Sequence, residues 1–347
     1  MNSSALTNRL VAGGSCLATA TLGAVGYALV LTTLWHYRAK FHRESNFYLL
    51  VWTLAAGDCL VLLAQFLIAV PISLTGLPLY GRGTALLVVT SVDHVGFRIC
   101  LFTSFTIGLN RFLCFVRPGW HRTLFGESRI LLWSAFVALL AVFYLINDLL
   151  VGWRSTFHHD KFYFDSQRAN LSREYEELLR VWGLKTLESV RSAVFSYCPL
   201  ANFALYVGTY VFIRASQLTR KSGDVVSLAS RHHRLEKQFL LQGLLICVAT
   251  VLETATFNNS ARIYTLGCEL LGNCLFGSLV ISNVIILNSS INPYIFLTFN
   301  SVLRHKAKQL LGIGTQRGNN ATTTAVTMKG VLKCTAHRRQ DKNNDNT

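Results

Sequence analysis

The sequence predicts an all-α membrane protein, a seven-transmembrane helical bundle followed by a short amphipathic juxtamembrane helix. Apolar residues make up 51% of the 347 residues and charged residues only 14%, against about 25% charged residues in a typical soluble domain. A helix crosses a bilayer in about 20 residues, and in lipid every backbone group needs an internal partner, which favours helices. The alternating segments of a transmembrane β-barrel are absent. The apolar residues fall instead into seven long blocks, at about 15–35, 47–75, 85–116, 130–152, 190–213, 239–257 and 271–299.

The positive charge of the chain predicts its orientation. The formal net charge is +16, and 22 of the 33 Lys and Arg lie in segments 36–45, 111–129, 214–237 and 304–347. With the amino terminus outside and the carboxyl terminus in the cytoplasm, all four segments are cytoplasmic, as the positive-inside rule requires. We therefore expect a multi-pass plasma-membrane protein whose basic segments contact membrane lipids or an acidic partner, and no binding of nucleic acid.

Four regions follow from this reading. Residues 1–14 form an extracellular amino terminus without a cleavable signal peptide, 15–299 the seven-transmembrane bundle, 300–311 an amphipathic helix on the inner leaflet, and 312–347 a disordered cytoplasmic tail. The tail is polar and rich in Gly, Asn and Thr, which is typical of disorder. Asn2 and Asn170 stand in glycosylation sequons within predicted outer segments.

The polar residues inside the spans are the candidate functional residues, because ionisable side chains are costly in a membrane and are usually functional. Span two contains Asp58 within "LAAGDCLVLL". Span three contains Asp93, His94 and Arg98, and Arg111 near its end. Span seven, "ILNSSINPYIF", clusters amide and hydroxyl side chains around Pro293. Proline frees a backbone carbonyl that such neighbours can satisfy.

These motifs resemble the rhodopsin-like G-protein-coupled receptors over about residues 15–311. The resemblance is carried by seven spans, "LAAGD" in span two, "NRF" closing span three and "NPYIF" closing span seven. Within that family, "NRF" together with "RLEKQFLLQGLL" opening span six looks most like the nematode serpentine chemoreceptors.

The resemblance implies a coupling site for a heterotrimeric G protein. Arg111 matches the family arginine that acids hold at rest and that packs against the G protein on activation, with Phe112 beside it. Asn110 replaces the acid that the family has beside this arginine. Glu236, at the inner end of span six, is therefore the acid expected to hold Arg111 at rest. The alternative is an arginine that extends to the interface and only orients its helix.

The resemblance also implies an activation switch and a sodium site. The switch comprises Asn292, Pro293 and Phe296, where Phe296 lacks the hydroxyl of the family tyrosine. Span six has neither the family tryptophan nor its proline, so we expect it to bend less, or elsewhere. Asp58 matches the sodium-binding aspartate, and the alternative is a protonated Asp58 that is hydrogen-bonded to span seven without an ion. The residues expected at the sodium site are Asp58, Cys100, Asn288, Ser289 and Asn292.

The family ligand site lies in the outer half of the bundle. Asp93 matches the acid that binds amines in the amine receptors, and His94, Arg98 and Glu253 lie at similar depth. Acidic or neutral ligands and peptides are also candidate ligands, because Arg98 would repel a cation. The alternative is an Asp93 that pairs internally, for example with Arg98.

The resemblance implies a disulfide between the outer end of span three and the segment 153–190. We expect this disulfide to be absent, because neither place contains a cysteine. Cys268 and Cys274 are left as a possible pair, although they point apart if that stretch is helical.

The predicted function is that of a G-protein-coupled receptor for an odorant, a small molecule or a peptide. A transporter or channel is the alternative, and Asp58 alone gives it little support. An enzyme is not expected, because no paired catalytic residues occur in adjoining spans, and no cofactor beyond the sodium ion is expected.

Overall fold

The structure is a computed structural model, and it describes residues 3–39, 41, 47–80, 84–126, 129–158, 161–169, 172–218, 226–272 and 274–313. Asn2, Asn170 and the tail from residue 314 lie outside the described residues.

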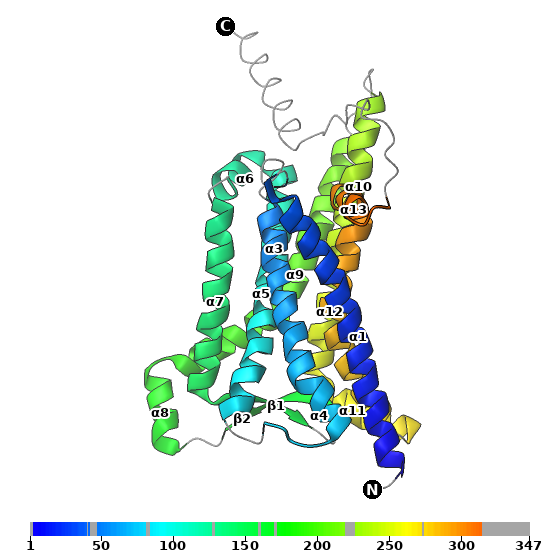
Figure 1. The fold of residues 1–347 in the computed structure, drawn as a ribbon. Helices are drawn as coiled ribbons and strands as arrows, with labels where there is room; N and C mark the ends of the chain where they lie inside the picture. Colours follow the sequence, from blue (N-terminus) through cyan, green and yellow to red (C-terminus); the bar gives the residue numbers. More distant parts are fainter. Residues whose placement is uncertain are drawn as a thin grey trace.

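Seven long helices run back and forth along one axis (Figure 1). Their bounds in chain order are α1 Ser3–His36, α3 Phe47–Ala64, α5 Thr84–Val116, α7 Arg129–Val151, α9 Leu184–Leu218, α10 Val226–Asn258 and α12 Cys274–Phe299. The second helix is extended by the π-helical segment η1 Gln65–Ala69 and by α4 Val70–Thr75. These elements cover the seven apolar blocks, so the all-α bundle is confirmed.

Six of these helices are long and apolar enough to cross a membrane, counted over the described part of the chain. The helix outside that count is α9, whose middle carries polar residues such as Asn202 and Thr209. It packs against both α5 and α10, so it completes the seven-helix bundle. Apolar side chains such as Leu132 and Leu139 on α7 are exposed, as expected of a surface that contacts lipid.

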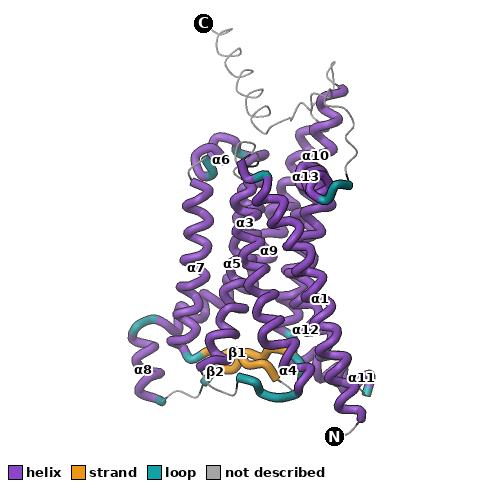
Figure 2. Tube along the Cα trace, viewed as in Figure 1, coloured by secondary structure: helices purple, strands orange, loops and turns teal. Residues whose placement is uncertain are grey.

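The short elements mark the two ends of the bundle (Figure 2). One end, called the hairpin end here, carries α4, the strands β1 Trp153–His158 and β2 Tyr163–Arg168, α8 Arg173–Val181 and α11 Ser260–Leu271. The strands are antiparallel, with Trp153 opposite Arg168 and His158 opposite Tyr163. The opposite end, called the α6 end, carries α6 Pro118–Leu124 and the amphipathic helix α13 Ser301–Leu310.

Two features go beyond what the sequence predicted. Helix α1 begins at Ser3, inside the segment expected to be a separate amino terminus, and its Gly13 lies directly against Leu74 of α4. In the outer segment 153–183, for which no secondary structure was predicted, β1 and β2 form a hairpin and α8 follows it. Helix α10 contains no proline and runs without a break past Glu253 as far as Asn258.

Helices α3 and α5 approach each other closely through two glycines. A Cβ atom on Gly96 would lie 2.7 Å from the backbone oxygen of Gly57, and a Cβ on Gly57 would lie 2.7 Å from the Cys100 sulfur. Only glycine allows this approach, and it places Asp58 beside α5.

We predict that Gly96→Ala destabilises the protein, because backbone atoms must separate to admit the methyl group. Overpacking of this kind costs about 1–3 kcal/mol. Thermal unfolding of purified protein measures the effect. Gly14→Ala on α1 is the control, since nothing lies within 4 Å of its Cβ position. Equal melting temperatures for the two variants would contradict the close packing.

Candidate functional site

Arg111 is buried at the α6 end, near the end of α5. Its guanidinium carbon lies 4.2 Å from the centre of the Phe47 ring on α3. Such a cation–π contact contributes about 0.5–2 kcal/mol. Arg111 also lines a small pocket among α3, α5, α9, α10 and α12, together with Tyr206, Gln242 and Phe296. The side chain of Glu236, the predicted acid partner, lies outside the described part of the chain.

Asn110, beside Arg111, contacts the loop helix α6. Its side-chain nitrogen lies 3.3 Å from Nε2 of His121. Burial lowers the pKa of His121 from its usual value, and the nearby Arg111 and Arg122 lower it further. A neutral imidazole ring can accept a hydrogen bond from the Asn110 amide. The residue that replaces the family acid thus joins α5 to α6.

Asp58 is fully buried and joins four helices. Tyr27 of α1 donates its hydroxyl to the carboxylate, and Asn292 of α12 donates its amide at 2.9 Å. The Cys100 thiol of α5 lies at 3.2 Å. Ser289 lies beside the same carboxylate. Of the predicted sodium set, Asp58, Cys100, Ser289 and Asn292 are therefore together.

Asn288, the fifth predicted member, contacts another carboxylate. Its amide donates to Glu253 of α10 at 2.5 Å, and its oxygen has no hydrogen-bond partner among the described residues. Asp93 of α5 accepts from Gln65 in η1 at 3.2 Å. The Glu253 carboxylate lies within electrostatic range of both Asp93 and Asp58. Glu253 is thus a buried carboxylate near two others.

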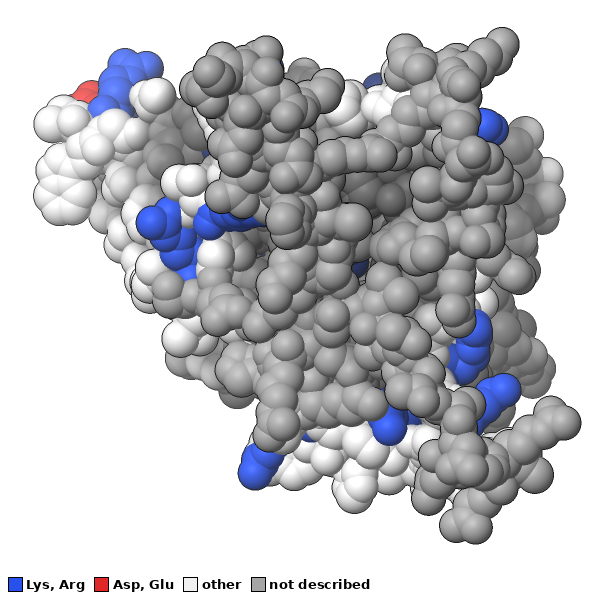
Figure 3. All heavy atoms as spheres, turned by 90° about the horizontal axis from the view of Figure 1, so that it is seen from above, with Lys and Arg blue, Asp and Glu red and all other residues white. Residues whose placement is uncertain are grey.

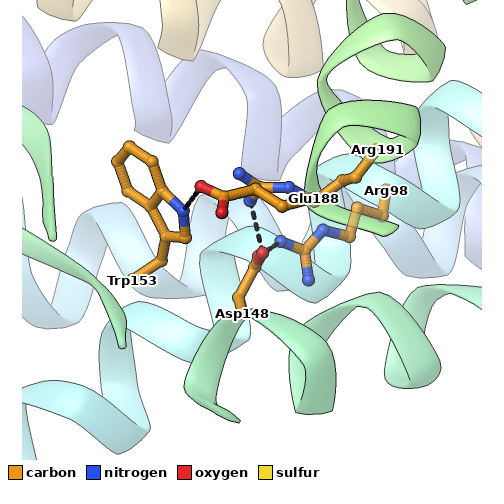
Figure 4. Close-up of polar contacts among 5 residues, drawn as sticks. All are labelled: Arg98, Asp148, Trp153, Glu188 and Arg191. Carbon is orange, nitrogen blue, oxygen red and sulfur yellow. Dashed lines mark hydrogen bonds and ion pairs between the residues drawn. The ribbon is translucent and has the colours of Figure 1, made fainter. Parts of the chain in front are cut away.

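The remaining two predicted ligand residues lie on another side of α5. Arg98 forms a buried ion pair with Asp148 of α7, and Arg191 of α9 pairs with the other oxygen of the same carboxylate. Figure 4 shows this cluster, with the Trp153 indole donating to Glu188 at 2.6 Å beside it. His94 lies within electrostatic range of Arg98 and Arg191. The four predicted ligand residues therefore divide into two groups, with Asp93 and Glu253 in one and His94 and Arg98 in the other.

The hairpin covers its end of the bundle without a covalent bond to α5. Ser282 of α12 donates to the backbone oxygen of Phe162, and Phe157 and Phe164 pack on η1, α4 and α5. The structure contains a disulfide between Cys268 and Cys274. The two cysteines face each other because α11 ends at Gly272, whose φ of +58° interrupts the helix.

The sequence analysis missed several partners in these sites, among them Tyr27, Gln65, Asp148 and Arg191. Asp148 carried a usable signal, because it is an ionisable residue at the end of an apolar block. The other three carried none, since a single tyrosine, glutamine or loop-proximal arginine is common in such helices.

The described surface of the α6 end is basic (Figure 3). Its exposed cationic residues come from the start of the α1–α3 connection, from α6 and its flanks, from α9 and from α13. They are Arg38, Arg117, Arg122, Arg129, Arg214, Arg304 and Lys308.

Comparison with known proteins agrees with these features. The family described as "Serpentine type 7TM GPCR chemoreceptor Srx" matches residues 20–300. No match is found among curated proteins. The match covers most of the chain, from the middle of α1 to the end of α12. The chain therefore belongs to the serpentine seven-transmembrane chemoreceptor family Srx, a family of G-protein-coupled receptors.

Proposed function

We propose that this receptor detects a small extracellular chemical and transmits the signal to a heterotrimeric G protein. The amino terminus and the hairpin end lie outside the cell, and the α6 end lies in the cytoplasm. The basic surface of the α6 end supports this orientation, because cationic residues gather on the cytoplasmic side of membrane proteins.

The observation that carries the proposal is the position of Arg111. It lies where five helices meet at the basic end of the bundle, and it is held against Phe47 rather than extended to solvent. A rearrangement of these helices would release the guanidinium, whose fixed N–H donors suit backbone or carboxylate oxygens of a partner. Ligand binding shifts such an equilibrium by its differential affinity for the two arrangements.

We predict that Arg111→Ala lowers nucleotide exchange on the G protein by about 5- to 150-fold, the range of a typical coupling free energy. Basal exchange should also fall in this variant. In the wild type, Asn110 replaces the acid that would hold Arg111 at rest, so we expect basal exchange that depends on Arg111. Exchange in membranes with matched surface expression measures both. Arg173→Ala, an exposed arginine at the hairpin end, is the control. Unchanged exchange in Arg111→Ala would refute the coupling role.

The proposed ligand site comprises the buried carboxylates of Asp93 and Glu253. Asp93 and Glu253 have amide partners, Gln65 and Asn288, and no cationic partner among the described side chains. Arg98 is not their partner, because it pairs with Asp148 on another side of α5. Buried carboxylates are costly without a compensating partner, so we infer a ligand that brings positive charge or hydrogen-bond donors.

We predict that activating compounds are small bases, found by a reporter-cell screen that contains equal numbers of amines and carboxylic acids. Glu253→Gln and Asp93→Asn should each raise the half-maximal concentration of such an amine about tenfold, equivalent to about 1.4 kcal/mol. Glu174→Gln, in exposed α8, is the matched control. A screen that returns only acids would contradict this assignment while leaving the G-protein proposal intact.

A sodium ion is proposed at Asp58. Asp58, Ser289 and the unpaired side-chain oxygen of Asn292 supply oxygen atoms, which a hard cation prefers. Tyr27 and Cys100 supply hydrogen-bond donors instead, so the ion would compete with them for the carboxylate. Its contribution would be to neutralise this buried charge.

We predict that sodium chloride raises the melting temperature of the purified receptor relative to choline chloride, because ion binding stabilises the folded state by mass action. Asp58→Asn should abolish the difference, and Asp93→Asn should retain it. The same melting temperature in both salts would show that Asp58 is held by its protein donors alone.

A further inference from the structure

The helix α8 has three faces with different surroundings. Leu179 is buried against the protein. Glu176, on a second face, forms an ion pair with Arg168 of β2 at 3.7 Å. The third face carries Leu178, which is 41% exposed, and the adjoining positions Val181 and Trp182 are 80% and 67% exposed. A compact group of large apolar side chains at the surface usually marks an interaction site.

Tyr175 fixes the direction of the third face. Its hydroxyl donates to the backbone oxygen of Leu150 at 3.0 Å, in the last turn of α7. Leu178 and Trp182 follow Tyr175 by three and seven residues, so they continue along the same side of α8. That side therefore begins at the end of α7 and runs on beyond it.

The outer side of α7 is the lipid-facing surface of the bundle. Exposed apolar residues run along its whole length, from Leu131 and Leu132 to Leu149 and Leu150. Figure 1 shows α8 outside the bundle, next to the hairpin end of α7. The apolar face of α8 is thus continuous with a surface that already contacts lipid.

We propose that α8 is a membrane anchor whose face Leu178–Val181–Trp182 inserts into the bilayer–water interface beside α7. Tryptophan is enriched at this depth, because its ring is apolar and its indole N–H can bond to water or headgroups. Glu176 and Arg180 lie on the opposite side of α8. The exposed Glu174 lies one turn before Leu178, at the amino-terminal edge of the apolar face, where its carboxylate stays in water. The partner is the lipid itself, and the anchor holds the segment between α7 and α9 at the membrane surface.

The anchor has a structural consequence for the hairpin. No cysteine occurs in residues 153–190, so noncovalent contacts hold this segment. Arg168 of β2 pairs with Glu176 of α8, and Trp153 of β1 pairs with Glu188 of α9. Lipid contact at α8 adds an attachment point on the outer side of the segment, opposite the bond from Ser282 to Phe162.

Tryptophan fluorescence of the full-length receptor in vesicles tests the proposal. The receptor is reconstituted in phosphatidylcholine with and without bromine in its acyl chains, and the Trp182 signal is obtained by subtracting the spectrum of Trp182→Phe. We expect brominated lipid to remove at least half of this signal, while iodide in the buffer has little effect. The result should not depend on the ratio of lipid to protein.

Trp153→Phe is the matched control, since Trp153 is half-buried and hydrogen-bonded to Glu188 in the same segment. Its difference signal should be insensitive to brominated lipid. A Trp182 signal quenched by iodide and not by bromine would place the face in water and overturn the proposal. A signal quenched by neither reagent would mean that protein, such as a second copy of the receptor, covers the face, and would overturn it equally.

Discussion

The buried carboxylate of Asp58 is the interaction on which the rest of the bundle depends. A buried charge is tolerated only with partners, and those partners come from α1, α5 and α12 through Tyr27, Cys100 and Asn292. Because four helices meet at one group, their rotation about their own axes is fixed.

On α12, Asn288, Asn292 and Phe296 follow one another at intervals of four residues and so share one face. That face contacts Glu253, then Asp58, and then lines the pocket of Arg111. The proposed ligand layer and the proposed coupling layer are therefore connected by two turns of a single helix.

The charges around α5 are separated by helix geometry. Asp93 and Arg98 are five residues apart, which turns their side chains about 140° away from each other around the helix axis. Asp93 faces Gln65 in η1, whereas Arg98 faces Asp148 of α7. Their closeness in sequence suggested mutual neutralisation, and the structure gives each a separate partner. Asp93 thus lies at the proposed ligand site, and Arg98 takes part in the ion pairs that join α5, α7 and α9.

The sequence predicted the seven helices and the α13 helix because each depends on a local apolar pattern, which a single chain displays fully. It also predicted that Asp58, Cys100, Ser289 and Asn292 meet, through the family resemblance. It could not predict contacts whose two halves lie on distant segments with no pattern of their own. The pairing of Asp148 with both Arg98 and Arg191, the contact of Asn110 with His121 and the stacking of Arg111 on Phe47 are of this kind. The start of α1 at Ser3 was missed because packing against α4 extends a helix beyond its membrane-length apolar block.

The position of the disulfide leaves the hairpin joined to the helices by noncovalent contacts. The bond between Cys268 and Cys274 closes a loop of only six residues' separation, so it restrains the turn between α11 and α12 and little else. The hairpin is attached to α12 by the hydrogen bond from Ser282 to Phe162 and to α9 by the hydrogen bond from Trp153 to Glu188. Both are single hydrogen bonds, each with a net contribution of about 0.5–3 kcal/mol. A ligand that moves α9 or α12 therefore moves the hairpin without breaking a covalent link, and contacts made by the hairpin act back on the same two helices. Helix α12 also carries Asn292, which donates to Asp58, and Phe296, which lines the Arg111 pocket. A movement of the hairpin can therefore be passed to both places through this one helix.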